Sequence, residues 1–382
     1  PLNKMARVIP IAMALKGILT LPQLATRTLP GPFRGQANAS YAPERRFLAE
    51  ARPAAIDRAS HKFSPRALRT LTGYATTNIS ISAMNQVWLC GQDWNYPVLA
   101  KSLFGKTAKL LINNKDALEN DVMVYGVGSN CRFLNTFPGY VLTMNGESRR
   151  SHATDKNKKH FFIGPWVEND RTLMIYNVAR RYLSLKDHMP DWFLANGMPT
   201  RLKNDREHFA IYASRNCQKA RDAAFRRLNS IATVHASGNC PRNVAKTKSP
   251  YATPRSQMEN NPKLFSHYKF VLCMENKKQP GYVTEKILYA FISGAIPIYY
   301  GTEEVFELFN RKAFIYYDVF DPQEALDLVT HLNSNETAYR DIVSQPILAE
   351  GLMTLEKYFS LDDDIGSGQL KSQILSMINI KA

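Results

Sequence analysis

The chain has 382 residues, of which 45% are apolar and 21% are charged, and its formal net charge is +16. This length can hold two domains with sizeable cores, and the apolar fraction excludes wholesale disorder. The positive charge suits anionic partners such as nucleotide sugars, acidic glycans, membranes or nucleic acid. Because the basic residues are scattered and no zinc-finger, homeodomain or RNP pattern occurs, we expect no nucleic-acid partner.

The amino-terminal segment is basic, and residues 1–43 contain no Asp or Glu. A mostly apolar stretch over residues 8–24 is interrupted by two prolines and a lysine, so it is too short and too broken for a regular membrane span. A trimmed signal anchor or signal peptide, a transit-like peptide and a disordered lead all remain open. We expect residues 1–82 to form a lead and a stem, with Pro43–Arg52 as a helix.

Short apolar runs alternate with polar or helical segments between residues 83 and 205, which is typical of an α/β layer. A Gly-x-Gly pair follows one of these runs, but Cys131 occupies the third glycine position of a dinucleotide-binding motif, which argues against a nicotinamide cofactor. The runs are Val87–Gly91, Lys109–Ile112, Asp121–Tyr125, Gly139–Thr143 and Phe161–Gly164.

A second series of elements begins at residue 206. The apolar run His208–Ser214 precedes a helical segment whose apolar residues recur at helical spacing up to Leu228. The runs Phe270–Cys273 and Ala295–Tyr300 are predicted as parallel strands covered on both faces. An amphipathic helix is expected over Asp321–Leu332, and residues 346–382 are interpreted as helices that cross back onto the first domain.

Polar residues gather between the strand Phe270–Cys273 and the helix that follows it. Thr284 is placed as the N-cap of this helix, and Gly294 as the residue that ends it. Ligands of open α/β sheets bind outside the carboxyl ends of the strands, and the amino end of a helix attracts phosphate. The residues expected to converge where a nucleotide diphosphate would sit are Glu275, Asn276, Tyr282, Glu285 and Lys286.

The five cysteines show no Cys-x-x-Cys pair. Cys90 and Cys273 lie in apolar strand-like runs and are predicted as buried thiols. Cys217 and Cys240 flank one helical segment and are candidates for a disulfide. The odd count leaves at least one thiol without a partner in the chain, so the cysteines leave the redox compartment open.

Three motifs in the second half belong together: Glu275-Asn276, Gly281-Tyr-Val-Thr-Glu-Lys286 and Ile296-Pro-Ile-Tyr-Tyr-Gly301. In this order they resemble the donor-site signature of the α1,3/4-fucosyltransferases, glycosyltransferase family 10. The resemblance implies an α/β fold of GT-B architecture, with two facing Rossmann-like domains and the active site in the cleft. Residues 83–205 would form the acceptor-side domain and residues 206–345 the GDP-fucose-binding domain.

The resemblance also implies the reaction, an inverting transfer of fucose from GDP-fucose to a GlcNAc-type hydroxyl of a glycan, in α1,3 or α1,4 linkage. Glu147 occupies the position of the family's general base, although Arg149 stands where the family usually has proline. Lys286 and Arg221 would stabilise the leaving diphosphate, with Arg215 as the alternative arginine. The other implied donor contacts are Glu275, Asn276, Tyr282, Thr284 and Glu285.

No tightly bound cofactor is implied, since GDP-fucose is a co-substrate. The donor half has no Asp-x-Asp motif after a strand, so a divalent metal is not expected to be essential. The implied partners are GDP-fucose and an oligosaccharide or glycoprotein acceptor. The implied location is the Golgi or another secretory-pathway membrane, with a lumenal catalytic domain and membrane association through residues 1–82. Glycosylation triplets at Asn38, Asn78 and Asn335 agree with such a compartment.

Two alternatives remain open. One is a GT-B transferase that uses another nucleotide sugar, such as GDP-mannose or a UDP-sugar. The other is an inactive homologue that binds glycans, a hypothesis suggested by the altered loop after Glu147 and by the shuffled arginine segment around Arg221. The sequence leaves the acceptor glycan and the linkage to O3 or O4 open.

Overall fold

The residues that the computed structural model describes all fall within Thr70–Ala382. They are 79–80, 84–90, 96–126, 131–146, 159–165, 171–179, 182, 206–214, 216–238, 240, 243–244, 254–361, 368–378 and 380–381. The expected lead and stem lies outside them except for the short strand β1 (Ile79–Ser80), so the helix proposed over Pro43–Arg52 is not described. No helix in the described part of the chain has both the length and the apolar composition needed to cross a bilayer.

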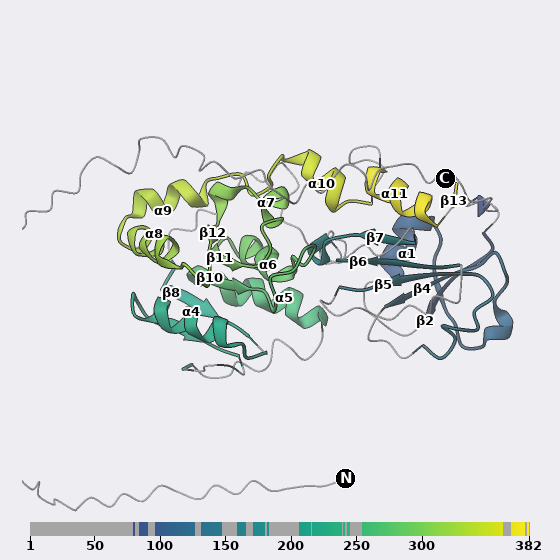
Figure 1. The fold of residues 1–382 in the computed structure, drawn as a ribbon, viewed down its shortest axis with the longest axis horizontal. Helices are drawn as coiled ribbons and strands as arrows, with labels where there is room; N and C mark the ends of the chain where they lie inside the picture. The colour runs from purple at the N-terminus through teal and green to yellow at the C-terminus, as the bar shows by residue number, and fades with distance from the viewer. Residues whose placement is uncertain are drawn as a thin grey trace, which may run out of the picture. The chain divides into compact units, whose positions relative to one another are not determined.

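The first half of the described chain forms a six-stranded parallel sheet with the order β3-β2-β4-β5-β6-β7 (Figure 1). The five strands expected from the sequence are all present, although β3 is shorter than its apolar run. The edge strand β7 was not predicted, because its three half-buried residues show no apolar alternation. The strands are β2 (Val87–Cys90), β3 (Lys109–Leu110), β4 (Val122–Gly126), β5 (Tyr140–Met144), β6 (His160–Gly164) and β7 (Thr172–Met174).

Alternate residues of this first sheet enter two different apolar clusters, because successive side chains of a strand point to opposite faces. On one face, Val122, Val124 and Leu142 pack in the cluster that includes helix α1 (Tyr96–Phe104). On the other face, Met123 and Val141 pack against residues of the connections that follow β3 and β4. The short 3₁₀ helix η3 (Asn114–Asp116) lies in the first of these connections.

The second half contains a five-stranded parallel sheet with the order β12-β11-β10-β8-β9. Its strands are β8 (His208–Tyr212), β9 (Val234–Ala236), β10 (Tyr268–Met274), β11 (Ile296–Tyr300) and β12 (Ile315–Tyr316). Its connections carry α4 (Lys219–Asn229), α5 (Pro254–Phe265), α6 (Glu285–Ser293), α7 (Val305–Leu308) and η5 (Arg311–Ala313). Helices α8 (Gln323–Ser334) and α9 (Glu336–Val343) follow the last strand. The prediction of two parallel α/β sheets is therefore confirmed.

Strand β10 shows how this second sheet is covered on both faces. Phe270 and Leu272 pack with α4, α8 and α9, whereas Val271 and Cys273 pack with α6. Full burial of side chains of this size stabilises the fold by about 2 kcal/mol each relative to exposure. Helix α6 ends where expected, because Gly294 adopts a left-handed φ of 76° that a residue with a Cβ disfavours.

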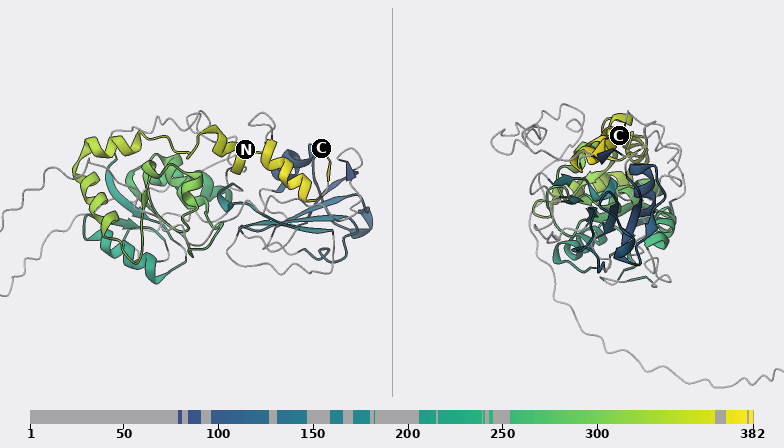
Figure 2. Two further views of the ribbon diagram at one scale, coloured as in Figure 1. Left: turned by 45° about the horizontal axis from the view of Figure 1, so that its top comes forward. Right: turned by 90° about the vertical axis from the view of Figure 1, so that its right-hand side faces the viewer.

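The carboxyl-terminal helices connect the second sheet back to the first. Helix α10 (Leu352–Tyr358) contacts α7, and helix α11 (Gln369–Met377) contacts β7 of the first sheet (Figures 1 and 2). The strand β13 (Ile380–Lys381) then pairs in parallel with β1. These contacts agree with the expectation that residues after 345 cross back onto the first domain, although the domain boundaries themselves stay predictions.

Two disulfides are present among the described residues, Cys90–Cys131 and Cys217–Cys240. The second was a candidate from the sequence, and Cys273 is a buried free thiol as predicted. The prediction of a buried thiol at Cys90 was wrong. Cys90 is the last residue of β2, and β2 pairs in parallel with β4, so the loop after β4 brings Cys131 to the same edge of the sheet.

Alanine substitutions at two glycines can test whether the donor motif contacts the first domain. Gly281 (φ 74°) and Gly105 (φ 65°) are both left-handed, but a Cβ at Gly281 would overlap the carbonyl oxygen of Pro165, whereas a Cβ at Gly105 would meet nothing. We expect Gly105→Ala to cost about 1 kcal/mol from backbone strain alone. Gly281→Ala should cost about 3 kcal/mol because the overlap adds to that strain.

Urea unfolding of the two variants at equal protein concentration measures both free energies. Equal losses in the two variants would show that Gly281 and Pro165 are not in contact in solution.

Candidate active site

The first component of the site is a buried carboxylate at the carboxyl end of β10. The side chain of Glu275 has no exposure to solvent. One of its carboxylate oxygens, Oε1, accepts hydrogen bonds from the backbone N–H of Thr284 (2.7 Å) and from the Thr284 hydroxyl (2.8 Å). The other, Oε2, lies 2.8 Å from Nζ of Lys286. Every contact therefore links the end of β10 to the beginning of α6.

Thr284 is the N-cap residue of α6, as predicted, with extended backbone angles of φ −109° and ψ −178°. Its side chain makes no capping bond within the helix and contacts Glu275 instead. The Glu275 carboxylate accepts the Thr284 N–H and places negative charge at the positive end of the helix dipole. The beginning of α6 is thus stabilised by a residue of the preceding strand.

Lys286 is the first cation of the site. Its Nζ donates to Glu275 Oε2 and to Thr284 Oγ1, both at 2.8 Å, and its side chain keeps 30% exposure. Burial by itself lowers the pKa of Lys286, but the charges of Glu275 and Glu285 outweigh burial, so the net pKa is raised. Lys286 is therefore a fixed positive charge at neutral pH, with two of its three N–H groups bonded among the described residues.

Arg221 is the second cation and lies on the buried face of α4, with 2% exposure. Its Nε donates to the carbonyl oxygen of Glu275 at 3.3 Å, and one terminal nitrogen donates to Ser214 Oγ (3.1 Å) and to the carbonyl of Asn216 (3.0 Å). The other terminal nitrogen donates to Asn276 Oδ1. Burial lowers the pKa of Arg221, but guanidinium stays protonated in proteins, so the charge remains.

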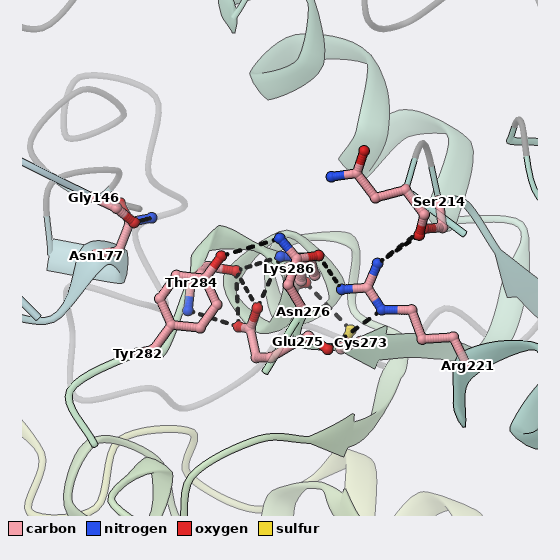
Figure 3. A network of polar contacts seen from close by, with 11 residues as sticks. Gly146, Asn177, Ser214, Arg221, Cys273, Glu275, Asn276, Tyr282, Thr284 and Lys286 are labelled. Atoms are coloured by element: carbon pink, nitrogen blue, oxygen red, sulfur yellow. Dashed lines mark hydrogen bonds and ion pairs between the residues drawn. The ribbon is translucent and has the colours of Figure 1, made fainter. Parts of the chain in front are cut away.

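Asn276 joins the two halves of the network, as Figure 3 shows. Its Oδ1 accepts from Arg221, and its Nδ2 donates to the hydroxyl of Tyr282 at 3.3 Å. Glu285, the first residue of α6, is half-buried beside Lys286. The structure thus gathers the donor-side residues expected from the sequence around the carboxyl end of β10 and the first turn of α6.

Two further residues of this region were not singled out from the sequence. Ser214 lies two residues after β8, and its hydroxyl accepts a hydrogen bond from Arg221. Its position near a strand end is the signal that could have identified it. Glu304 follows β11; its carboxylate accepts from the backbone N–H of Gly281 and from Thr302 Oγ1 (3.2 Å). Burial raises the pKa of Glu304, although the bond from Gly281 opposes that shift. Glu304 thereby stabilises the polar loop before α6.

Glu147, the expected base, lies outside the described residues, as does Arg215, the alternative arginine. The strand that leads to Glu147 is described up to Gly146, whose carbonyl accepts a 2.5 Å hydrogen bond from Nδ2 of Asn177. The next residue, Val178, donates its N–H to the carbonyl of Val283 in the donor motif at 2.9 Å. Residues 177–178 therefore contact both the residue that precedes Glu147 and the donor motif.

Comparison with protein families identifies the second half of the chain. Residues 203–344 match the model described as "Glycosyltransferase family 10 (fucosyltransferase) C-term". These residues are a family 10 carboxyl-terminal domain. The match contains Arg221 and the complete network from Glu275 to Lys286, so the resemblance inferred from the sequence motifs is confirmed.

Curated relatives of the family 10 domain include proteins of bacteria and plants. An alpha-(1,3)-fucosyltransferase of Helicobacter pylori is 38% identical over 124 residues, which cover 32% of this chain and 24% of the relative. An alpha-(1,4)-fucosyltransferase of Arabidopsis thaliana is 32% identical over 141 residues, which cover 34% of this chain and 35% of the relative. The chain thus spans between a quarter and about a third of the length of these relatives.

A solved structure extends the likeness in fold beyond the family 10 domain. The crystal structure of an alpha1,3-fucosyltransferase with GDP-fucose has a TM-score of 0.52 to this chain and is 19% identical to it. The match covers 82% of this chain and 94% of that chain. The predicted GT-B architecture with two parallel α/β sheets is confirmed by this match.

No group of three or more His, Cys, Asp or Glu side chains suited to a metal ion occurs within the described residues. The positive charges that the described network offers near the end of β10 come from Arg221 and Lys286.

The energetic role of the ion pair can be measured with Lys286→Met, which keeps the length of the side chain and removes its charge. The variant leaves the Glu275 carboxylate buried without its bonded cation, so we expect a loss of about 3 kcal/mol in unfolding free energy. This value is near the low end for buried pairs because Lys286 keeps partial exposure.

The exposed Lys312→Met serves as the matched control, and we expect it to change stability by less than about 0.5 kcal/mol. Similar urea midpoints for both variants would show that the ion pair does not stabilise the fold.

Proposed function

We propose that the protein transfers fucose from GDP-fucose to a GlcNAc-type hydroxyl of a glycan, in α1,3 or α1,4 linkage, with inversion at the sugar carbon. The observation that carries the proposal is the placement of Arg221 and Lys286 at the carboxyl end of β10, beside the amino end of α6. A nucleotide diphosphate is the ligand that such an arrangement favours, because two cations and a helix amino end face one edge of a parallel sheet.

On the donor side, both cations keep hydrogen-bonding capacity for a diphosphate. Arg221 uses four of its five N–H groups within the described residues, and Lys286 uses two of three. Their charges would stabilise the diphosphate as the bond to fucose breaks. Tyr282 and Asn276 would contact the fucose–phosphate region, and Glu285 would accept hydrogen bonds from the ribose hydroxyls.

On the acceptor side, Glu147 would act as the general base. It would take the proton from the acceptor hydroxyl while that oxygen forms its bond to C1 of fucose. The bond from C1 to the diphosphate oxygen breaks at the same time, and its electron pair leaves with GDP. Support for this role comes from the sequence motif and from Asn177, which holds the carbonyl of Gly146 next to the loop.

A compartment of the secretory pathway, such as the Golgi, is the proposed location. The support comes from the two disulfides, which persist in oxidising compartments and are rare in reducing ones. Membrane association through residues 1–82 belongs to the same proposal and rests on the sequence of that segment.

The deciding experiment measures GDP release from GDP-fucose with a panel of acceptors, including N-acetyllactosamine and a trimmed N-glycan core. GDP-mannose and a UDP-sugar serve as control donors. Acceptor-dependent release from GDP-fucose alone is the expected result. Release from a control donor would point to another nucleotide sugar, and GDP binding without any release would favour an inactive homologue that binds glycans.

The base can be tested with Glu147→Gln, which keeps the size of the side chain but cannot take a proton. We expect kcat to fall by about 10² to 10⁴, the usual contribution of a general base, while the Kd for GDP stays unchanged. Glu119→Gln changes an exposed glutamate of the same domain and should keep normal turnover. A Glu147→Gln enzyme with normal kcat would remove Glu147 from the reaction.

The expected independence from metal can be tested with EDTA. If Arg221 and Lys286 compensate the charge of the diphosphate, an excess of EDTA should leave the initial rate of fucose transfer unchanged. Loss of activity in EDTA, restored by added Mg²⁺ or Mn²⁺, would contradict this role of the two side chains.

A further inference from the structure

We infer that Glu275 is a positioning residue that holds both cations of the donor site without contacting the donor. The inference builds on the proposed function, because it concerns how Arg221 and Lys286 are presented to a diphosphate. It differs from the role that the sequence resemblance implies for Glu275, which is a direct donor contact.

Burial and complete hydrogen bonding together separate Glu275 from the donor, whereas the equally buried Arg221 keeps one N–H group for a ligand. The Glu275 side chain has no exposure, whereas Lys286 keeps 30%. Both carboxylate oxygens are already used, Oε1 by the N–H and hydroxyl of Thr284 and Oε2 by Lys286 and the same hydroxyl. A ligand would have to displace these bonds to reach the carboxylate, and each broken bond would leave a buried polar group unpaired. Lys286 is therefore the member of this group that faces solvent.

The main chain of Glu275 holds the other cation. Its carbonyl accepts from Nε of Arg221 at 3.3 Å, and its N–H donates to the carbonyl of Tyr300 at 2.8 Å. The second bond continues the pairing of β10 with β11 by one residue, which fixes the direction of the carbonyl. Glu275 thus holds Arg221 through its backbone and Lys286 through its side chain. A side-chain substitution therefore removes a hydrogen bond of Lys286 and leaves the hydrogen bonds of Arg221 in place.

The charge of Glu275 also affects the protonation of Lys286. The groups that face Lys286 are Glu275, Glu285 and Tyr282, together with the thiol of Cys273 beneath it. The charge of Glu275 also acts on Tyr299, whose pKa is raised well above its usual value by burial and then by that charge. Glu275 is the one carboxylate bonded to Lys286 among the described residues, and its charge opposes the effect of burial on the pKa of Lys286.

The test is a calorimetric titration of GDP into Glu275→Gln and wild type, from about pH 6 to about pH 9.5. Glutamine keeps the size and accepts the Thr284 N–H, but it removes the charge. Burial is then opposed by Glu285 and Tyr282 without the charge of Glu275, so the pKa of Lys286 falls below its value in wild type and the lysine loses its proton at lower pH. We expect GDP affinity about tenfold below wild type near pH 7, with a further loss as the pH rises.

The control is Glu336→Gln, which removes an exposed carboxylate from its ion pair with Arg340 on α9 (3.0 Å). It should bind GDP as wild type does at every pH. An unchanged pH dependence in Glu275→Gln would overturn the inference, as would a loss of GDP binding that is equal at all pH values. Failure of wild type to bind GDP would instead count against the proposed function, so the two failures are distinguishable.

A double-variant cycle keeps the inference testable if Glu275→Gln folds poorly. Glu275→Gln combined with Lys286→Met removes both charges, so it should be more stable than Lys286→Met alone, whose carboxylate is left unpaired. Because Glu275 acts on the donor through Lys286, adding Glu275→Gln to Lys286→Met should not weaken GDP binding further. A further tenfold loss would show that Glu275 contacts the donor directly.

Discussion

The buried ion pair between Glu275 and Lys286 is the constraint on which the donor side of this protein depends. A carboxylate without solvent exposure needs a bonded cation and complete hydrogen bonding, since an uncompensated charge would cost several kcal/mol. Lys286 and Thr284 meet that need from the first turn of α6. The end of β10, the beginning of α6 and the position of one cation are therefore parts of a single electrostatic arrangement, and none of them can shift alone.

The same motif is also where the two sheets are linked. Val178 donates to Val283, one residue before the N-cap of α6, and Gly281 packs against the carbonyl of Pro165, directly after β6. Asn177 in turn holds Gly146 at the end of β5. Backbone groups make these contacts, apart from the Asn177 amide, so they depend on chain geometry more than on side-chain identity. The residues proposed to bind the donor and the strand that leads to the expected base are thus held in one continuous framework.

Much of this arrangement could be predicted because strand ends and helix beginnings leave clear signals. Glu275 and Asn276 follow the apolar run that ends β10, and Gly294 marks the end of α6. The remaining contacts depend on pairing between residues far apart in the sequence, which local patterns do not reveal. Cys90 was mistaken for a thiol because its partner is brought near only by the pairing of β2 with β4. Thr284 was placed correctly as an N-cap, but its bonding partner lies nine residues earlier on another element, beyond the reach of local capping rules.

The return of the chain to the first sheet has a consequence for biosynthesis. Helix α11 packs on β7, and β13 pairs with β1 at the opposite end of the described sequence. Domains generally fold as units while the ribosome elongates the chain, from the amino terminus onward. The first sheet of this protein lacks its α11 cover until residues 369–377 have emerged, after the whole family 10 domain has been made. A nascent chain therefore leaves β7 without its α11 contact during that interval, so the apolar side chains of this edge strand stay more exposed until synthesis is nearly complete.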